Sequence, residues 1–126
     1  MERRSEQVVH LTLPCRPESA AVARHVFDEL DLPANTLADA QLLTTELVTN
    51  SIVHAAGERI ELDVVVGAAH VHVAVCDEGG PSEPRVRRQD VDDTSGRGLF
   101  LVDAIADEWG SHVDGRTAVW FRLRRR

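Results

Sequence analysis

The sequence predicts a two-layer α/β sandwich, an α+β fold in which helices cover one face of a mainly antiparallel, mixed sheet. Two periodicities and their order lead to this prediction. Apolar residues recur at three- and four-residue spacing in some segments and alternate at two-residue spacing in others. These segments follow the order strand, helix, helix, two strands, loop, helix and two strands.

The first half of the chain supplies one strand and two helices. Residues 8–13 are rich in β-forming side chains, and this strand is expected to end at Pro14, which lacks a backbone donor. Apolar spacing over residues 19–30 predicts a helix with one buried stripe. The same spacing predicts a second helix from about Thr36 to Ala55, which Gly57 ends.

The second half supplies four strands, a loop and a third helix. Residues 60–66 and 71–75 alternate around a glycine turn, which predicts a β-hairpin. Residues 77–95 have no period and are rich in charge, glycine and proline, so a long loop is expected, and such loops are usually functional. A helix over 96–106 and two closing strands, around 108–113 and 117–123, complete the prediction.

Length, charge and cysteine content restrict the class of protein. At 126 residues and 43% hydrophobic content, the chain fits a single domain over residues 1–126. No segment approaches the roughly 20 apolar residues of a membrane span, and the polar beginning lacks a signal-peptide core, so a cytoplasmic protein without membrane contact is expected. Cys15 and Cys76 are interpreted as buried thiols. The net charge of −7 opposes nucleic-acid binding.

The second predicted helix carries Glu46, Asn50 and His54 at four-residue spacing, along one stripe beside apolar residues. A solvated face explains this helix, taken alone, as well as a functional site does. In the functional interpretation, Glu46 is a general base and Asn50 gives one oxygen to Mg²⁺, which also takes water and substrate phosphates as ligands. His54 extends the stripe, although a histidine near a helix end more often caps or packs.

Two glycine-containing segments follow this helix. In Asp77-Glu78-Gly79, the Asp can accept a hydrogen bond from an exocyclic amine such as that of adenine, and glycine lets the backbone approach a flat ligand. In Gly96-Arg97-Gly98-Leu99, backbone N–H groups at a helix start can bind phosphate. Each segment alone is a weak signal. Their order after the base-and-metal helix predicts a nucleotide site.

Together, these segments resemble the GHKL ATPase superfamily, which includes gyrase, histidine-kinase and mismatch-repair ATPases. Residues 46–55 resemble its N box, Asp77-Glu78-Gly79 its first glycine box and Gly96–Leu99 its second. The short lid and the ending from Trp109 to Trp120 are most similar to bacterial anti-sigma-factor serine/threonine kinases. This resemblance implies a histidine-kinase-like ATP-binding domain with its core over about residues 8–123 and an ATP lid over about 78–95.

The resemblance also implies residue roles and partners. Asn50 coordinates Mg²⁺, Glu46 is the general base, Asp77 receives the adenine amine and Thr117 lies near adenine. The implied protein partners are a small antagonist that accepts phosphate on serine or threonine, a sigma factor, and a second copy in a homodimer. The remaining residues expected at the ATP are His54, Gly79, Gly96, Arg97, Gly98 and Leu99, with Arg97 closing over the γ-phosphate.

The first glycine box departs from the superfamily pattern Asp-x-Gly-x-Gly, because Pro81 stands at the last glycine. This departure concerns the hinge of the lid, and it favours a non-catalytic ATP-dependent binding module. Glu46 favours the alternative of a kinase that phosphorylates an antagonist and sequesters a sigma factor in a partner switch. A structural domain with a vestigial site leaves Glu46 and Asn50 unexplained. The kinase is the function that the sequence predicts.

Overall fold

The computed structural model describes residues 6–54, 57–79 and 94–126, with side chains from residue 99 onward in the last range. The chain forms a strand, two helical segments, a long helix, a hairpin, a third helix and a second hairpin. In order, these are β1 (Gln7–Pro14), α1 (Glu18–His25), the 3₁₀ helix η1 (Val26–Glu29), α2 (Ala34–His54), β2 (Arg59–Val66), β3 (His70–Asp77), α3 (Thr94–Ile105), β4 (Glu108–Asp114) and β5 (Arg116–Arg124).

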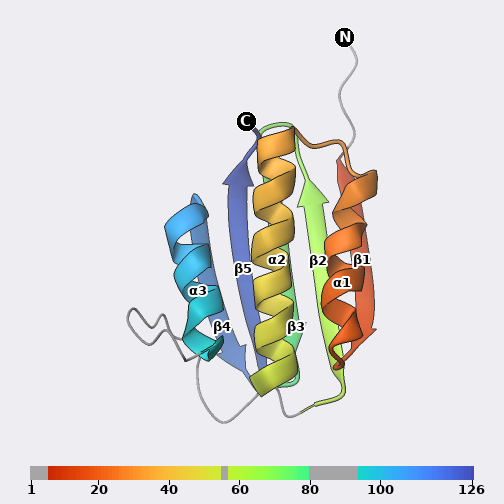
Figure 1. The fold of residues 1–126 in the computed structure, drawn as a ribbon, viewed down its shortest axis with the longest axis vertical. Helices are drawn as coiled ribbons and strands as arrows, with labels where there is room; N and C mark the ends of the chain where they lie inside the picture. Colours follow the sequence, from red (N-terminus) through yellow and green to blue (C-terminus); the bar gives the residue numbers. More distant parts are fainter. Residues whose placement is uncertain (1–5, 55–56, 80–93) are drawn as a thin grey trace.

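The five strands form one sheet in the order β1-β2-β3-β5-β4. Helices α1, α2 and α3 lie side by side on one face of this sheet (Figure 1). The predicted two-layer fold is therefore confirmed. All strand pairs in the described ranges are antiparallel, so the sheet is more regular than the mixed sheet that the sequence predicts.

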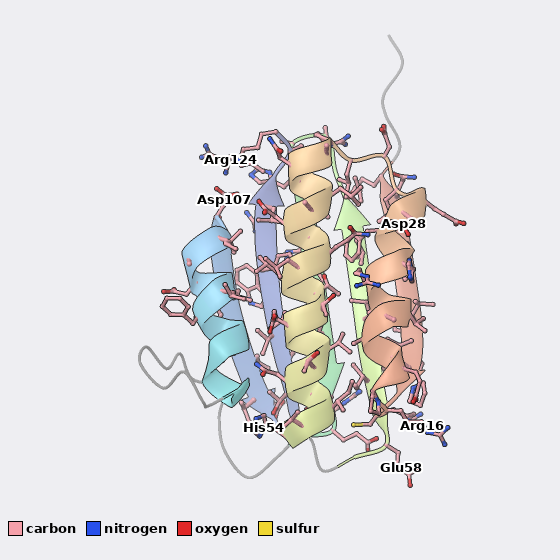
Figure 2. The ribbon with its side chains drawn as sticks, viewed as in Figure 1. Arg16, Asp28, His54, Glu58, Asp107 and Arg124 are labelled. Atoms are coloured by element: carbon pink, nitrogen blue, oxygen red, sulfur yellow. The ribbon has the colours of Figure 1, made fainter. Side chains whose placement is uncertain are left out.

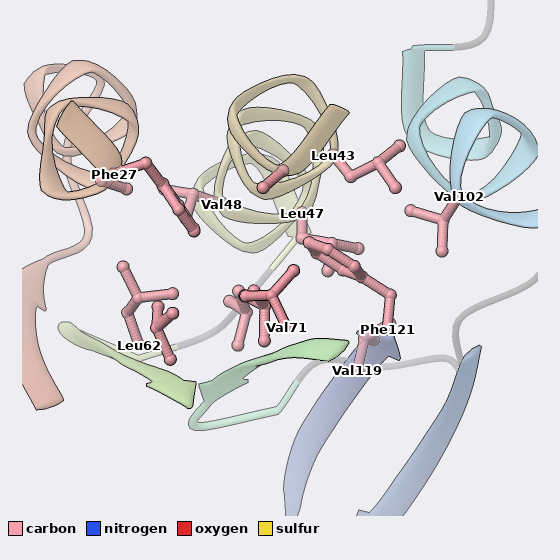
Figure 3. Packing of buried hydrophobic residues seen from close by; sticks show 14 of the residues in the cluster. Phe27, Leu43, Leu47, Val48, Leu62, Val71, Val102, Val119 and Phe121 are labelled. Carbon is pink, nitrogen blue, oxygen red and sulfur yellow. The ribbon is translucent and has the colours of Figure 1, made fainter. Parts of the chain in front are cut away.

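The core lies between the sheet and the helices. Alternate side chains of β2 and β3 are buried beneath the helices, as the two-residue periodicity predicts. Figure 3 shows Phe27 and Val48 above Leu62, and Phe121 reaching up from β5. Each fully buried side chain of this size contributes about 1.5–3 kcal/mol to folding, which holds the three helices in place.

Three boundaries differ from the predictions. β1 continues through Pro14, which is tolerated because β1 is an edge strand. The first predicted helix changes to 3₁₀ geometry after His25; this geometry aligns side chains three apart, and His25 Nδ1 lies 2.9 Å from Asp28 Oδ2. α3 begins at Thr94, so the predicted loop is shorter at this end, and Asp77 at its other end belongs to β3.

Several predictions fall on other parts of the chain. Ala55, Pro81 and most of the predicted lid lie outside the described residues. Cys15 and Cys76 are free thiols but only half-buried, so the prediction of buried thiols is wrong. Cys15 follows the end of β1, and Cys76 alternates with the buried side chains of β3 and so lies on the face of the sheet away from the helices. No helix in the described ranges is long and apolar enough to cross a membrane.

Candidate functional site

Strand β3 ends in a carboxylate that is buried and held by two donors. Asp77 is 8% exposed. Ser51 Oγ on α2 donates to Asp77 Oδ2 at 2.6 Å, and the Gly79 backbone N–H donates to Oδ1 at 2.8 Å. These donors offset the cost of burying the carboxylate. Because a carboxylate has about four acceptor positions, Asp77 can still accept an N–H from a ligand.

The glycine turn after Asp77 packs against the turn between β4 and β5. Gly79 has a φ of +91°, and a Cβ at this position would lie 3.0 Å from the Gly115 carbonyl oxygen and 3.9 Å from Thr117 Oγ1. Thr117 is also the neighbour of Asp77 across β3 and β5. Asp77, Gly79 and Thr117, which are expected at the nucleotide, therefore lie together.

Helix α2 brings its polar residues of four-residue spacing toward the same end of the sheet. Leu43 points from α2 toward α3 (Figure 3). Glu46 and Asn50 follow Leu43 by three and seven residues, so they lie on the α3 side of the helix, and both are half-buried. The next residue, Ser51, faces the sheet and bonds Asp77. Asn50 is thus adjacent in sequence to a residue that fixes the buried carboxylate.

The outer face of α2 is partly apolar, unlike that of an ordinary surface helix. Leu42 and Val53 are 40% and 56% exposed, whereas the polar Glu46 and Asn50 are half-buried. No hydrogen bond or ion pair joins either polar side chain to another side chain of the described ranges. A merely solvated face does not explain this arrangement, because the two polar residues are less exposed than the two apolar ones.

His54 is placed differently from these two residues. It is exposed at the end of α2, next to the end of the sheet where β3 finishes (Figure 2).

The start of α3 lies at the same end of the molecule as the ends of α2 and β3 (Figure 1). Gly96, Arg97 and Gly98 belong to the first turns of α3, and their side chains lie outside the description. N–H groups of a first turn have no partner within the helix, and they favour an anion such as phosphate. Leu99 is 2% exposed and packs in the core, so only its backbone is available to a phosphate.

Residues 13–123 match the family described as histidine kinase-like ATPase domain. The chain belongs to this family. The matched segment lies within the core predicted at about residues 8–123 and includes each of the three motifs. No curated protein matches the chain.

As a histidine kinase-like ATPase domain, the protein is an ATP-binding domain of the GHKL superfamily, and such domains usually bind ATP with Mg²⁺. The residues present fit this ligand. Asp77 has spare acceptor positions, and a Cβ at Gly79 would crowd the Gly115 carbonyl oxygen at 3.0 Å. The half-buried Asn50 offers an uncharged oxygen, which suits Mg²⁺ when phosphates and waters complete its ligands.

Two residues of this end of the ATPase domain were not assigned roles from the sequence. Ser51 gave no signal, because a helical serine is common and its partner is distant in the chain. Glu78 Oε1 accepts the backbone N–H groups of Glu58 and Arg59 at 2.9 and 3.0 Å, and these hydrogen bonds lower the pKa of the Glu78 carboxyl. Glu78, which directly follows Asp77, thereby links the end of β3 to the start of β2.

Proposed function

We propose that this ATPase domain is a protein serine/threonine kinase of the anti-sigma-factor type. Its substrate is a serine or threonine hydroxyl on a small antagonist protein, and its alternative partner is a sigma factor. Phosphorylation of the antagonist and capture of the sigma factor then form one partner switch. The support is the resemblance of the three motifs and of the chain's ending to that group of kinases.

The observation that carries this proposal is the placement of Glu46. It is half-buried on the α3 side of α2, one helical turn before Asn50, where a pure adenine pocket needs no carboxylate. A carboxylate at this position can take the proton of an acceptor hydroxyl.

Each residue then has a role in phosphoryl transfer. Bound ATP would supply the γ-phosphoryl group: a bond forms between the acceptor oxygen and the γ-phosphorus, the bond to the β,γ-bridging oxygen breaks, and ADP leaves. Asp77 orients the adenine through its amine, Asn50 holds Mg²⁺, and Glu46 receives the hydroxyl proton. Arg97, at the start of α3, neutralises charge on the transferred group.

The test is Glu46→Gln, which keeps the size of the side chain and removes the base. ATP affinity should stay near that of wild type, while the rate of transfer to purified antagonist proteins should fall by roughly 10²- to 10⁴-fold. Mass spectrometry of the antagonist measures the phosphoserine or phosphothreonine formed. Glu29→Gln, an exposed carboxylate at the end of η1, is the matched control. Equal transfer by Glu46→Gln and wild type would disprove the role of Glu46 as base.

A non-catalytic ATP-dependent binding module is the second candidate, and the motivating observation is Pro81 in the first glycine box. In this case ATP only orders the protein for a partner. The wild-type protein would then retain a sigma factor on a column only in the presence of ATP, and it would phosphorylate no antagonist.

A further inference from the structure

A cavity of about 520 Å³ lies where β1 ends and β2 begins. Residues 12–16 and residues 57–59 form its two walls, and we call this space the β1–β2 cavity. The walls are joined by the Cys15 backbone N–H, which donates to the Glu58 carbonyl oxygen at 2.9 Å. Figure 2 shows Arg16 and Glu58 at the same end of the molecule as His54. The cavity is therefore at the end of the sheet that also carries the nucleotide site.

Each wall of the β1–β2 cavity contributes an arginine. Arg16 follows β1, and Arg59 is the first residue of β2, opposite Pro14. Both residues are exposed, and neither guanidinium makes a hydrogen bond or an ion pair in the described part of the chain. By contrast, the guanidiniums of Arg116 and Arg122 pair with carboxylates of the sheet. The cavity thus has two cationic groups whose donors are unused.

A ligand with carboxylate groups fits these donors. A guanidinium presents parallel N–H groups that match a carboxylate in a bidentate pair. Glu58 lines the same cavity, so two positive charges and one negative charge leave a net charge of +1. This small surplus favours carboxylates, which carry one charge each, over a phosphate group, which carries about −1.5 to −2 at neutral pH. Pro14 and Cys15 provide an apolar wall for the carbon chain of such a ligand.

The β1–β2 cavity is connected to the nucleotide site through Glu78. A Cβ on Gly57 would overlap the Glu78 side chain, so the glycine leaves room for this side chain. Glu78 Oε1 accepts the backbone N–H groups of Glu58 and Arg59. Three consecutive residues of one wall are therefore in contact with the residue that directly follows Asp77.

A second connection starts from the other wall. The Cys15 thiol donates to the Ser51 carbonyl oxygen at 3.7 Å, and the Ser51 hydroxyl donates to Asp77. Burial, and to a lesser extent the charge of Asp77, raises the pKa of the Cys15 thiol and keeps its proton in place. Both walls of the cavity thus contact residues that hold or follow Asp77.

We propose that the β1–β2 cavity binds a carboxylate ligand and that this ligand strengthens ATP binding at Asp77. The ligand pairs with Arg16 and Arg59 and fixes the segment whose N–H groups hold Glu78. Because Glu78 then holds the turn after Asp77 in place, ATP binding has less ordering to do. Such coupling is reciprocal. It rests on ATP binding at Asp77, on which the proposed function also depends, whereas the carboxylate site itself does not.

The first test uses Cys15 as a reporter of the cavity. In a Cys76→Ser variant Cys15 is the only thiol, and mass spectrometry follows its alkylation by iodoacetamide at alkaline pH without ATP. Succinate at constant ionic strength should slow this alkylation. Replacing both Arg16 and Arg59 by Gln should raise the Kd for succinate by roughly 10- to 150-fold. Arg24→Gln, an exposed arginine of α1 outside the cavity, is the matched control and should leave the Kd unchanged.

Two further probes identify the class of the anion and its source. A tetraglutamate peptide with blocked ends represents an acidic segment of a protein, and inorganic phosphate represents a generic anion. Protection of Cys15 by succinate or by the peptide supports the site, and the probe that protects at the lower concentration identifies the source. Absence of protection by both, equal protection by phosphate, or protection that persists in the double arginine variant would overturn the proposal.

The second test measures the coupling by calorimetric titration with ATP at constant free Mg²⁺. Saturating succinate should lower the Kd for ATP by roughly 5-fold or more. Glu78→Ala should abolish this change while succinate still protects Cys15, and Glu78→Gln, which keeps an acceptor oxygen, should retain it. A folded wild-type protein that binds succinate with no change in its ATP affinity would disprove the coupling. If it binds succinate but no ATP, the proposed function fails and the carboxylate site stands.

Discussion

Polar side chains gather at both ends of helix α2. The two groups differ in how many of their hydrogen-bonding positions are used within the protein. At the beginning of α2, the hydroxyl of Thr36 lies 3.1 Å from the Arg126 carbonyl oxygen and accepts the Arg126 backbone N–H at 3.0 Å. Asp107 accepts hydrogen bonds from the Arg124 backbone at 2.7 Å and from the Arg126 guanidinium at 2.6 Å. Figure 2 shows Arg124 and Asp107 at this end of the molecule.

At the other end of α2, several hydrogen-bonding positions are not used by the described side chains. Asp77 is fixed by two donors but keeps acceptor positions, and neighbouring Glu46 and Asn50 have no partner among the described side chains. A network whose members satisfy each other stabilises the fold. A group of polar side chains that is held in place but keeps unused hydrogen-bonding positions is suited to a ligand. This group lies at the end of the sheet where α3 also starts, and a helix start favours an anion.

The largest expected effect on ATP affinity concerns Asp77. Asp77→Asn removes the charge and presents an amide donor beside the adenine amine, so the affinity for ATP should fall by about 1.5–3 kcal/mol, or roughly 10- to 150-fold in Kd. Calorimetric titration measures the affinity, and chemical unfolding measures the accompanying change in stability. Unchanged ATP affinity in a folded Asp77→Asn variant would mean that this carboxylate is only structural.

A smaller effect, on stability rather than on ATP affinity, is expected at the beginning of α2. Thr36→Val keeps the shape of the side chain but removes the hydroxyl, so the free energy of unfolding should fall by about 1 kcal/mol while the Kd for ATP stays constant. Thr45→Val is the matched control, because the Thr45 hydroxyl bonds only the Gln41 carbonyl of its own helix. A loss of ATP affinity in Thr36→Val would show that the two ends of α2 do not act separately.

Much of the fold could be predicted because the local spacing of apolar residues determines its strands and helices. The alternation over residues 60–66 and 71–75 fixes which side chains of β2 and β3 are buried. The 3₁₀ segment after His25 could not be predicted in this way, because a change from α to 3₁₀ geometry hardly alters the apolar spacing. The start of α3 at Thr94 could not be predicted either, because it precedes the first apolar residue of this helix, Leu99.

The candidate site was predictable in its residues but not in its connections. Asp77 and Gly79 were found from a local motif, whereas the Ser51 hydroxyl that holds Asp77 is 26 residues away in the chain. The approach of Gly115 to Gly79 likewise follows from the pairing of β3 with β5, which no short segment of sequence reveals.

The most direct test of the central claim is a calorimetric titration of the wild-type protein with ATP, with and without Mg²⁺. The account predicts one site of micromolar affinity, roughly −7 to −8 kcal/mol, which weakens when Mg²⁺ is removed. If the folded wild-type protein binds no ATP under either condition, the group formed by Glu46, Asn50 and Asp77 is not a nucleotide site in this chain.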